Sequence, residues 1–217
     1  MAFYEELQQA TATERNALLS VPIIGRALQG QVTLAQYIEF LTQAYHHVKH
    51  TTPLLMTCGG RVPESHEWIR TALAHYIEEE IGHQEWILND IKTCGGDAEA
   101  VRRGQPNLHT ELMVAYAYDT VMRNNPCGFF GMVYVLEGTS IQLATNAAGV
   151  LQKSLSLPDS AFSYLTSHGS LDLEHIDFFE GVVNRLERDE DKQAVIHCAR
   201  VFFHLYANIF RSLDGNA

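Results

Sequence analysis

The chain has 217 residues and a formal net charge of −11, with 15 Lys and Arg against 26 Asp and Glu. An acidic chain without a basic cluster suits neither nucleic acid nor an anionic membrane surface, so we expect no partner of either kind. The first 30 residues lack the basic start and apolar core of a signal peptide, which predicts a cytoplasmic protein.

Apolar residues recur every three or four positions along most of the chain, and alternating strand-like stretches are rare. We therefore predict an all-α fold made of a single domain, residues 1–217. Pairs or triplets of Gly, Asn and Pro mark the turns near residues 95, 125 and 158. The expected helices span 3–19, a short stretch after 22, 33–58, 64–94, 110–123, 126–155, a short stretch after 159, 168–186 and 189–213.

The second half of the 33–58 helix carries three imidazoles in five residues, at His46, His47 and His50. A single histidine in a helix is more often a hydrogen-bonded core or surface residue than a metal ligand. Three so close together predict that at least one faces the interior of a bundle. The sequence leaves open which one does.

A run of three glutamates ends in Glu80-Ile81-Gly82-His83. On a helix, Glu80 and His83 form the Glu-x-x-His pair with which helical bundles hold carboxylate-bridged metals. Glu79 shares a face with His83 as well, so either glutamate could be the ligand. Tyr76 lies one turn earlier on the same face. Its side chain could donate a hydrogen bond to the site, take part in redox chemistry or simply pack in the core.

Glu137 is the only charged residue between Arg123 and Lys153. A helix that is apolar nearly all round is buried, and an isolated buried carboxylate is costly unless it is paired, protonated or bound to a cation. The sequence therefore predicts a partner for Glu137. Several hydroxyl and amide side chains interrupt the apolar residues of this segment, which argues against a membrane span.

His168, Asp172 and His175 follow one another at i, i+4 and i+7, which places them on one face of a helix. Such a face normally carries aliphatic side chains when it is buried. Two imidazoles and a carboxylate there suit a divalent metal, although a solvated polar face would show the same pattern.

These four segments fall on four separate predicted helices, whose side chains can meet only inside the bundle. Glu80, Glu137 and Asp172 would bring three negative charges together, and two divalent cations would balance them. A set of imidazoles and carboxylates without thiolate favours iron or manganese, with zinc as a substitute.

The order and spacing of Glu80-x-x-His83, Glu137 and His168-x3-Asp172-x2-His175 resemble the haem-oxygenase-like diiron oxidases. Those enzymes are relatives of the thiaminase-II (TenA) and pyrroloquinoline-quinone synthase (PqqC) fold. The resemblance implies a seven-helix-type haem-oxygenase-like bundle that binds two Fe(II) ions, activates dioxygen and oxidises a small organic substrate. Known substrates of the group are fatty-acid-like or amino-acid-like, and the sequence does not choose between them.

The chain departs from that group in two places. Members typically supply a carboxylate from the helix that here carries His46 and His47, so an imidazole would replace it. Some members also have a glutamate at the position of Tyr76. One metal ion therefore remains an alternative to two.

Two other classes of protein remain as alternatives. A cofactor-free enzyme like thiaminase II would use Cys127 as nucleophile and a carboxylate such as Glu137 for proton transfer. A non-catalytic metal-binding or ligand-binding helical protein is the second alternative. In each case a homodimer is the common default for a helical protein of this size.

Overall fold

The computed structural model describes residues 1–214, apart from the side chains of residues 141, 142, 145 and 168–175. The described elements are helical throughout, which confirms the predicted fold class. Their bounds are α1 (Phe3–Ala10), α2 (Ala12–Leu19), α3 (Pro22–Leu28), α4 (Leu34–Val48), α5 (Thr51–Arg61), η1 (Glu64–His66), α6 (Glu67–Glu80), α7 (His83–Thr93), α8 (Ala98–Arg103), α9 (Leu108–Arg123), η2 (Pro126–Gly128), α10 (Phe129–Leu155), η3 (Asp159–Ala161), α11 (Ser163–Val183) and α12 (Asp189–Ser212).

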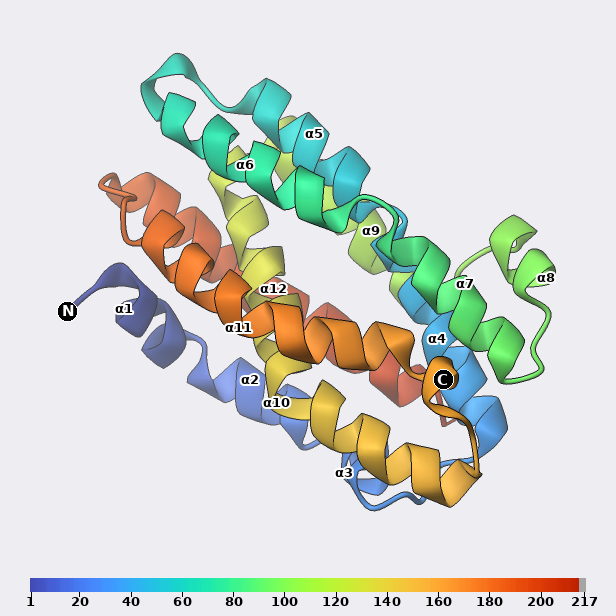
Figure 1. Ribbon diagram of the computed structural model, residues 1–217. Helices are drawn as coiled ribbons and strands as arrows, with labels where there is room; N and C mark the ends of the chain where they lie inside the picture. Colours follow the sequence, from blue (N-terminus) through green and yellow to red (C-terminus); the bar gives the residue numbers. More distant parts are fainter. Residues whose placement is uncertain (215–217) are drawn as a thin grey trace.

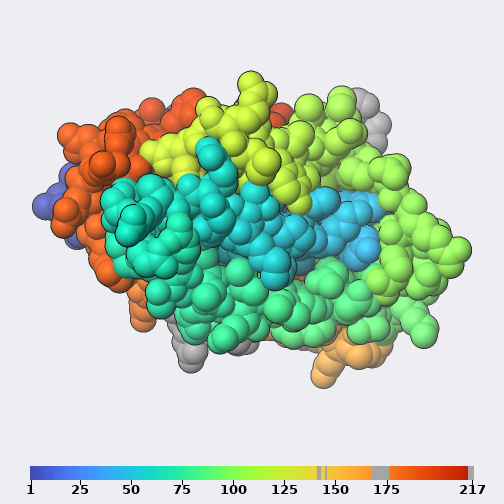
Figure 2. All heavy atoms as spheres, turned by 90° about the horizontal axis from the view of Figure 1, so that it is seen from above, coloured from blue at the N-terminus to red at the C-terminus, as the bar shows by residue number. Residues whose placement is uncertain are grey.

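Helix α10 is the centre of the arrangement, because it packs extensively against both α11 and α12. It bends along its length, so that its first half and its second half run in different directions (Figure 1). Helix α5 packs against α6, and α4 packs against α7. Seen from above, α5, α6, α7 and α9 cover one face of the molecule (Figure 2).

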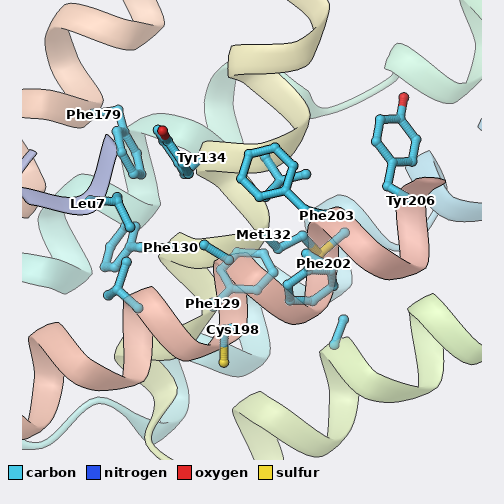
Figure 3. Close-up of a cluster of buried hydrophobic side chains, with 14 of the residues drawn as sticks. Leu7, Phe129, Phe130, Met132, Tyr134, Phe179, Cys198, Phe202, Phe203 and Tyr206 are labelled. Atoms are coloured by element: carbon cyan, nitrogen blue, oxygen red, sulfur yellow. The ribbon is translucent and has the colours of Figure 1, made fainter. Parts of the chain in front are cut away.

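The largest core cluster lies where the start of α10 meets α12 (Figure 3). Gly131 allows this contact, because a Cβ atom there would lie 2.7 Å from the Val195 carbonyl oxygen and 2.6 Å from the Ala199 nitrogen. Phe130 and Phe202 are fully buried beside it. Burying each such side chain contributes about 1.5–3 kcal/mol. The same packing fixes the register of the two helices.

The predicted helix 33–58 is wrong in its extent, since the structure divides it into α4 and α5. Its predicted start is confirmed: the Thr33 hydroxyl accepts a hydrogen bond from the Gln36 amide at 3.2 Å. The chain turns at Lys49 and His50, and Pro53 then occupies the first turn of α5, where a missing N–H costs little. Helix α5 continues to Arg61.

The predicted helix 64–94 is also two helices, because the chain breaks between Glu80 and His83. Ile81 is extended and Gly82 has a φ of 97°, a left-handed conformation that glycine adopts without a Cβ penalty. Glu80 therefore ends α6 and His83 begins α7. The i, i+3 argument for this pair fails, although the two side chains still meet.

Three further boundaries differ from prediction. Residues 3–19 form two helices that meet at Thr11, and the predicted helix 126–155 begins with the short turn η2. A short helix after residue 159 and a separate helix from 168 to 186 were predicted, but the structure has the short turn η3 followed by one long helix, α11.

Asp90 supports the start of α11. The buried Asp90 carboxylate accepts hydrogen bonds from the backbone amides of Ser163 at 3.1 Å and Tyr164 at 2.8 Å. Burial raises the pKa of this carboxyl group.

No described helix combines the length and the apolar character that a membrane span requires.

Candidate metal centre

A cavity of about 170 Å³ lies inside the bundle, between α3, α4, α5, α6, α10, α11 and α12. Its walls are mostly aliphatic and aromatic. Among the described residues that line it, Glu80 and Glu137 supply the only carboxylates, and His47 supplies the only imidazole. Three side chains that the sequence proposed as metal ligands therefore open onto one apolar space.

His47 is the member of the histidine cluster that reaches the cavity. It is 3% exposed, and its ring lies edge-on to that of Tyr206, with centroids 6.0 Å apart. His46 instead accepts from the Lys49 ammonium, with 3.2 Å between nitrogens, and burial lowers its pKa to about 4. His50 lies 3.1 Å from the Tyr118 hydroxyl. Neither of these two alternates is among the residues lining the cavity.

Of the two neighbouring glutamates Glu79 and Glu80, likewise only one reaches the cavity. Glu80 lines the cavity, whereas Glu79 does not and lies 3.4 Å from the imidazole of His75. His83 stands behind Glu80: its Nδ1 atom is 3.1 Å from Glu80 Oε2, and its ring stacks on Trp86 at a centroid distance of 4.1 Å. The structure thus places His83 against the Glu80 carboxylate and outside the described cavity wall.

Tyr76 also lines the cavity, one helical turn before Glu80 on α6. It is 2% exposed and packs edge-on against Phe178, with ring centroids 5.2 Å apart. Its ring therefore contributes to the core, as the packing interpretation expected. Its place on the wall keeps the interpretation as a hydrogen-bond donor open as well.

The side chains of His168, Asp172 and His175 lie outside the described residues. Their positions fall within α11, the helix that packs along α10, which carries Glu137. Their assignment as ligands stays a prediction.

Sequence reasoning missed Tyr206, whose ring packs against His47 on the cavity wall. It occurs in α12 among other large apolar residues, so its periodicity indicated only core packing. Cavity walls assembled from seven helices leave no local sequence signal, because neighbours along the wall are distant along the chain.

Cys127 does not line this cavity. It is 2% exposed, in η2, and burial raises the pKa of its thiol, as does the nearby Asp191 carboxylate. A protonated thiol away from the cavity is a poor nucleophile for a substrate bound there. The cofactor-free alternative thus lacks a cysteine on the described cavity wall.

The chemistry of the donor set fits iron. Two carboxylates and one imidazole form a hard-to-borderline oxygen and nitrogen set, which suits iron or manganese. Carboxylates crowded in apolar surroundings also favour a bound cation, because their mutual repulsion is poorly screened there. Helical bundles build dinuclear carboxylate sites from side chains of this kind on facing helices.

The fold and this donor set define a helical bundle with a candidate iron site in its interior. A family model described as iron-containing redox enzyme matches residues 38–207. The chain belongs to that family. A search of curated proteins finds no match.

Solved structures share the fold along the whole chain. A domain of unknown function with a heme oxygenase-like fold from Shewanella denitrificans is 25% identical, with a TM-score of 0.89 over 98% of this chain and 92% of that one. A TenA homologue from Pseudomonas syringae is 9% identical, with a TM-score of 0.81 over 99% and 93%. Heme oxygenase-1 from the cyanobacterium Synechocystis, in complex with heme, is 12% identical, with a TM-score of 0.77 over 100% and 94%.

Proposed function

We propose that this protein is a non-haem iron-dependent oxidase or oxygenase that activates dioxygen and oxidises a small molecule with an apolar chain. The observation that carries the proposal is the confinement of His47, Glu80 and Glu137 to one cavity whose other walls are mostly apolar. A site that joins metal-binding groups to an apolar pocket can hold a metal beside an organic substrate.

The proposed ligand set consists of His47, Glu80 and Glu137 from the described wall, together with His83 and the three α11 residues His168, Asp172 and His175. Two Fe(II) ions are the proposed occupancy, with one ion as the alternative. Iron, when bound, would supply the electrons that reduce dioxygen.

The chain's own residues prepare the site for that chemistry. His83 holds the Glu80 carboxylate through the contact at 3.1 Å, and the stacked Trp86 ring restrains the imidazole in turn. Tyr206 restrains His47 by edge-on packing. The apolar walls exclude water from the space beside these groups, which strengthens electrostatic interactions there.

The shape of the cavity favours a fatty-acid-like substrate over an amino-acid-like one. Its wall follows α10 from Glu137 to Leu151, fourteen residues later, which is roughly 21 Å along the helix. We call this stretch of the cavity its apolar arm. The described residues that line it include Leu143, Ala147 and, from α3, Leu28. An apolar chain gains about 0.8 kcal/mol per methylene that it buries against these walls, whereas a polar amino acid gains little from them.

Iron binding tests the site directly, and two adjacent glutamates provide a matched pair. We expect anaerobic loading with ferrous iron to leave near two irons per chain after desalting. Glu80→Gln should lower that number, because it removes a carboxylate from the cavity. Glu79→Gln should not, because Glu79 pairs with His75 outside it. Equal iron content in both variants would contradict the assignment.

Substrate class is tested by dioxygen consumption with saturated carboxylic acids of increasing chain length, and with amino acids as the comparison. We expect kcat/KM to rise with chain length, by about fourfold per methylene that the cavity accommodates. Ala147→Leu narrows the apolar arm and should shift the optimum to shorter acids. If the preferred acid length does not change in this variant, the alkyl chain of the substrate does not bind in this part of the cavity.

Failure of both tests would favour the other two classes. Turnover that survives complete removal of metal would indicate a cofactor-free enzyme. Stoichiometric metal binding without dioxygen consumption by any acid would indicate a non-catalytic metal-binding protein.

A further inference from the structure

A second group of metal-binding side chains lies at the end of the bundle where α6, α10 and α12 begin. Its members are His66 in η1, Cys127 in η2 and Asp191 in the first turn of α12. One nitrogen, one sulfur and one oxygen from these residues all lie within 4.8 Å of one another. The residues are 7%, 2% and 3% exposed, respectively, and none lines the cavity described above.

Neighbouring side chains hold two of the three groups, His66 and Asp191, against each other. The Ser65 hydroxyl lies 2.9 Å from His66 Nδ1, which leaves Nε2 facing Asp191 Oδ2 at 2.8 Å. Asn125 donates to the other oxygen of Asp191 at 2.7 Å. Histidines and carboxylates that bind metals are commonly held in this way, with the second polar atom of each engaged by a neighbour.

The charges of the group balance when a divalent cation is bound. Cys127 is 2% exposed, and a thiol buried in this way is neutral when no metal is bound. A divalent ion displaces the thiol proton and binds thiolate, carboxylate and a neutral imidazole, so two negative charges meet two positive ones. A neutral buried assembly avoids the cost of an uncompensated charge.

We propose that His66, Cys127 and Asp191 bind one zinc ion, separate from the proposed iron site. A thiolate together with imidazole and carboxylate is a donor set that zinc accepts and that suits iron-bound dioxygen chemistry less well.

The position of the ion gives it a structural role. It would join the starts of α6, α10 and α12, which are brought together at one end of the bundle (Figure 1). Further along, these same helices carry Glu80, Glu137 and Tyr206 on the cavity wall. The zinc ion would therefore hold together the starts of three helices that form the cavity wall, although the ion itself would not contact the cavity.

Cobalt(II) alone is the probe that separates the two sites. A thiolate ligand gives Co(II) an intense near-ultraviolet charge-transfer absorption, which carboxylates and imidazoles do not give. No described residue of the cavity wall is a cysteine, so this absorption reports only the cluster. We expect the full-length, metal-stripped protein to develop the band on titration with Co(II), and one equivalent of Zn(II) to abolish it.

Variants assign the band to its ligands. Cys127→Ser should reduce the intensity of the charge-transfer band at least tenfold. His66→Gln, which keeps the Cys127 thiol, should weaken Co(II) affinity at least tenfold. Cys198→Ser is the matched control, because Cys198 is buried as well but lies 3.4 Å from the Tyr116 hydroxyl and outside the cluster. Glu80→Gln should retain the band even if it loses iron.

Helical circular dichroism establishes that each variant is folded. Should Cys127→Ser not fold, His66→Gln decides the matter, because it leaves all four cysteines in place. A wild-type protein without the band, or a band of equal intensity in a folded Cys127→Ser variant, would overturn the proposal.

Discussion

Two groups of candidate metal ligands occupy this bundle, and they differ in what surrounds them. His47, Glu80 and Glu137 open onto an apolar cavity, whereas His66, Cys127 and Asp191 are enclosed by protein and engage one another. Catalytic metal sites keep a position open for substrate or water, and structural sites are closed. The difference in access is the reason for proposing chemistry at the first group and support of the fold at the second.

The largest expected effect separates two adjacent histidines. His47→Gln should lower turnover by more than about 100-fold, since even residues that only orient a metal ligand cost 10–100-fold when they are replaced. His46→Gln should stay within a few-fold of wild type, because His46 points to Lys49 and not into the cavity. Steady-state dioxygen consumption measures both. The reverse order would mean that His46 is the ligand.

Zinc binding should appear as stability at the closed site. At a free zinc concentration 100 times the dissociation constant, binding contributes about 2.7 kcal/mol, which raises Tm by roughly 5–11 °C in a chain of this size. Calorimetry of the metal-stripped protein with and without Zn(II) measures this shift. The Cys127→Ser variant should lose most of it, whereas Cys198→Ser should show the full shift. If Zn(II) does not change the Tm of the wild-type protein, the closed group is not a stabilising zinc site and does not differ from the cavity in the proposed way.

The turn between Glu80 and His83 should be sensitive to a single methyl group. Gly82→Ala forces a Cβ into a backbone with a φ of 97°, which costs about 1–2 kcal/mol. It should also weaken iron binding, because it disturbs the contact between Glu80 and His83. Gly60→Ala, in the last turn of α5 with no atom within 4 Å of the added Cβ, should instead stabilise the protein, by at most about 0.5–1 kcal/mol. Urea unfolding measures both, and equal effects would contradict the strain argument.

The smallest expected effect has opposite signs with and without metal. Glu137→Gln keeps the shape of the side chain but removes a negative charge from the cavity that also contains Glu80. The metal-free protein should gain on the order of 1 kcal/mol, or roughly 2–4 °C in Tm, while iron content falls. Melting curves of stripped and iron-loaded samples decide the sign. A loss of stability in the metal-free variant would show that the carboxylate has a structural role of its own.

Much of the fold follows from local sequence. The helical period, the Thr33 cap and the proline and glycine turns predicted helices in nearly all the places where the structure has them. The errors occurred where a helix breaks without a strong local signal. The left-handed turn at Gly82 is an example, because a single glycine within a helical pattern is compatible with either outcome.

The sequence proposed the members of the candidate site but could not say which of them face the cavity. Helical spacing could not separate Glu80 from Glu79 or His47 from His46, because neighbouring residues on a helix differ only in the direction in which they point. Tyr206 looked like core packing. The structure chose among them by placing one side chain of each pair on the cavity wall.

The sequence by itself determined that this chain is an all-helical member of a family of iron-containing redox enzymes, with imidazoles and carboxylates on several helices. Only the tertiary structure brought His66, Cys127 and Asp191 together, from three segments with no common motif. It also shaped the apolar cavity. Helical periodicity is a local property, whereas a cavity or a ligand cluster depends on the packing of helices that are distant along the chain.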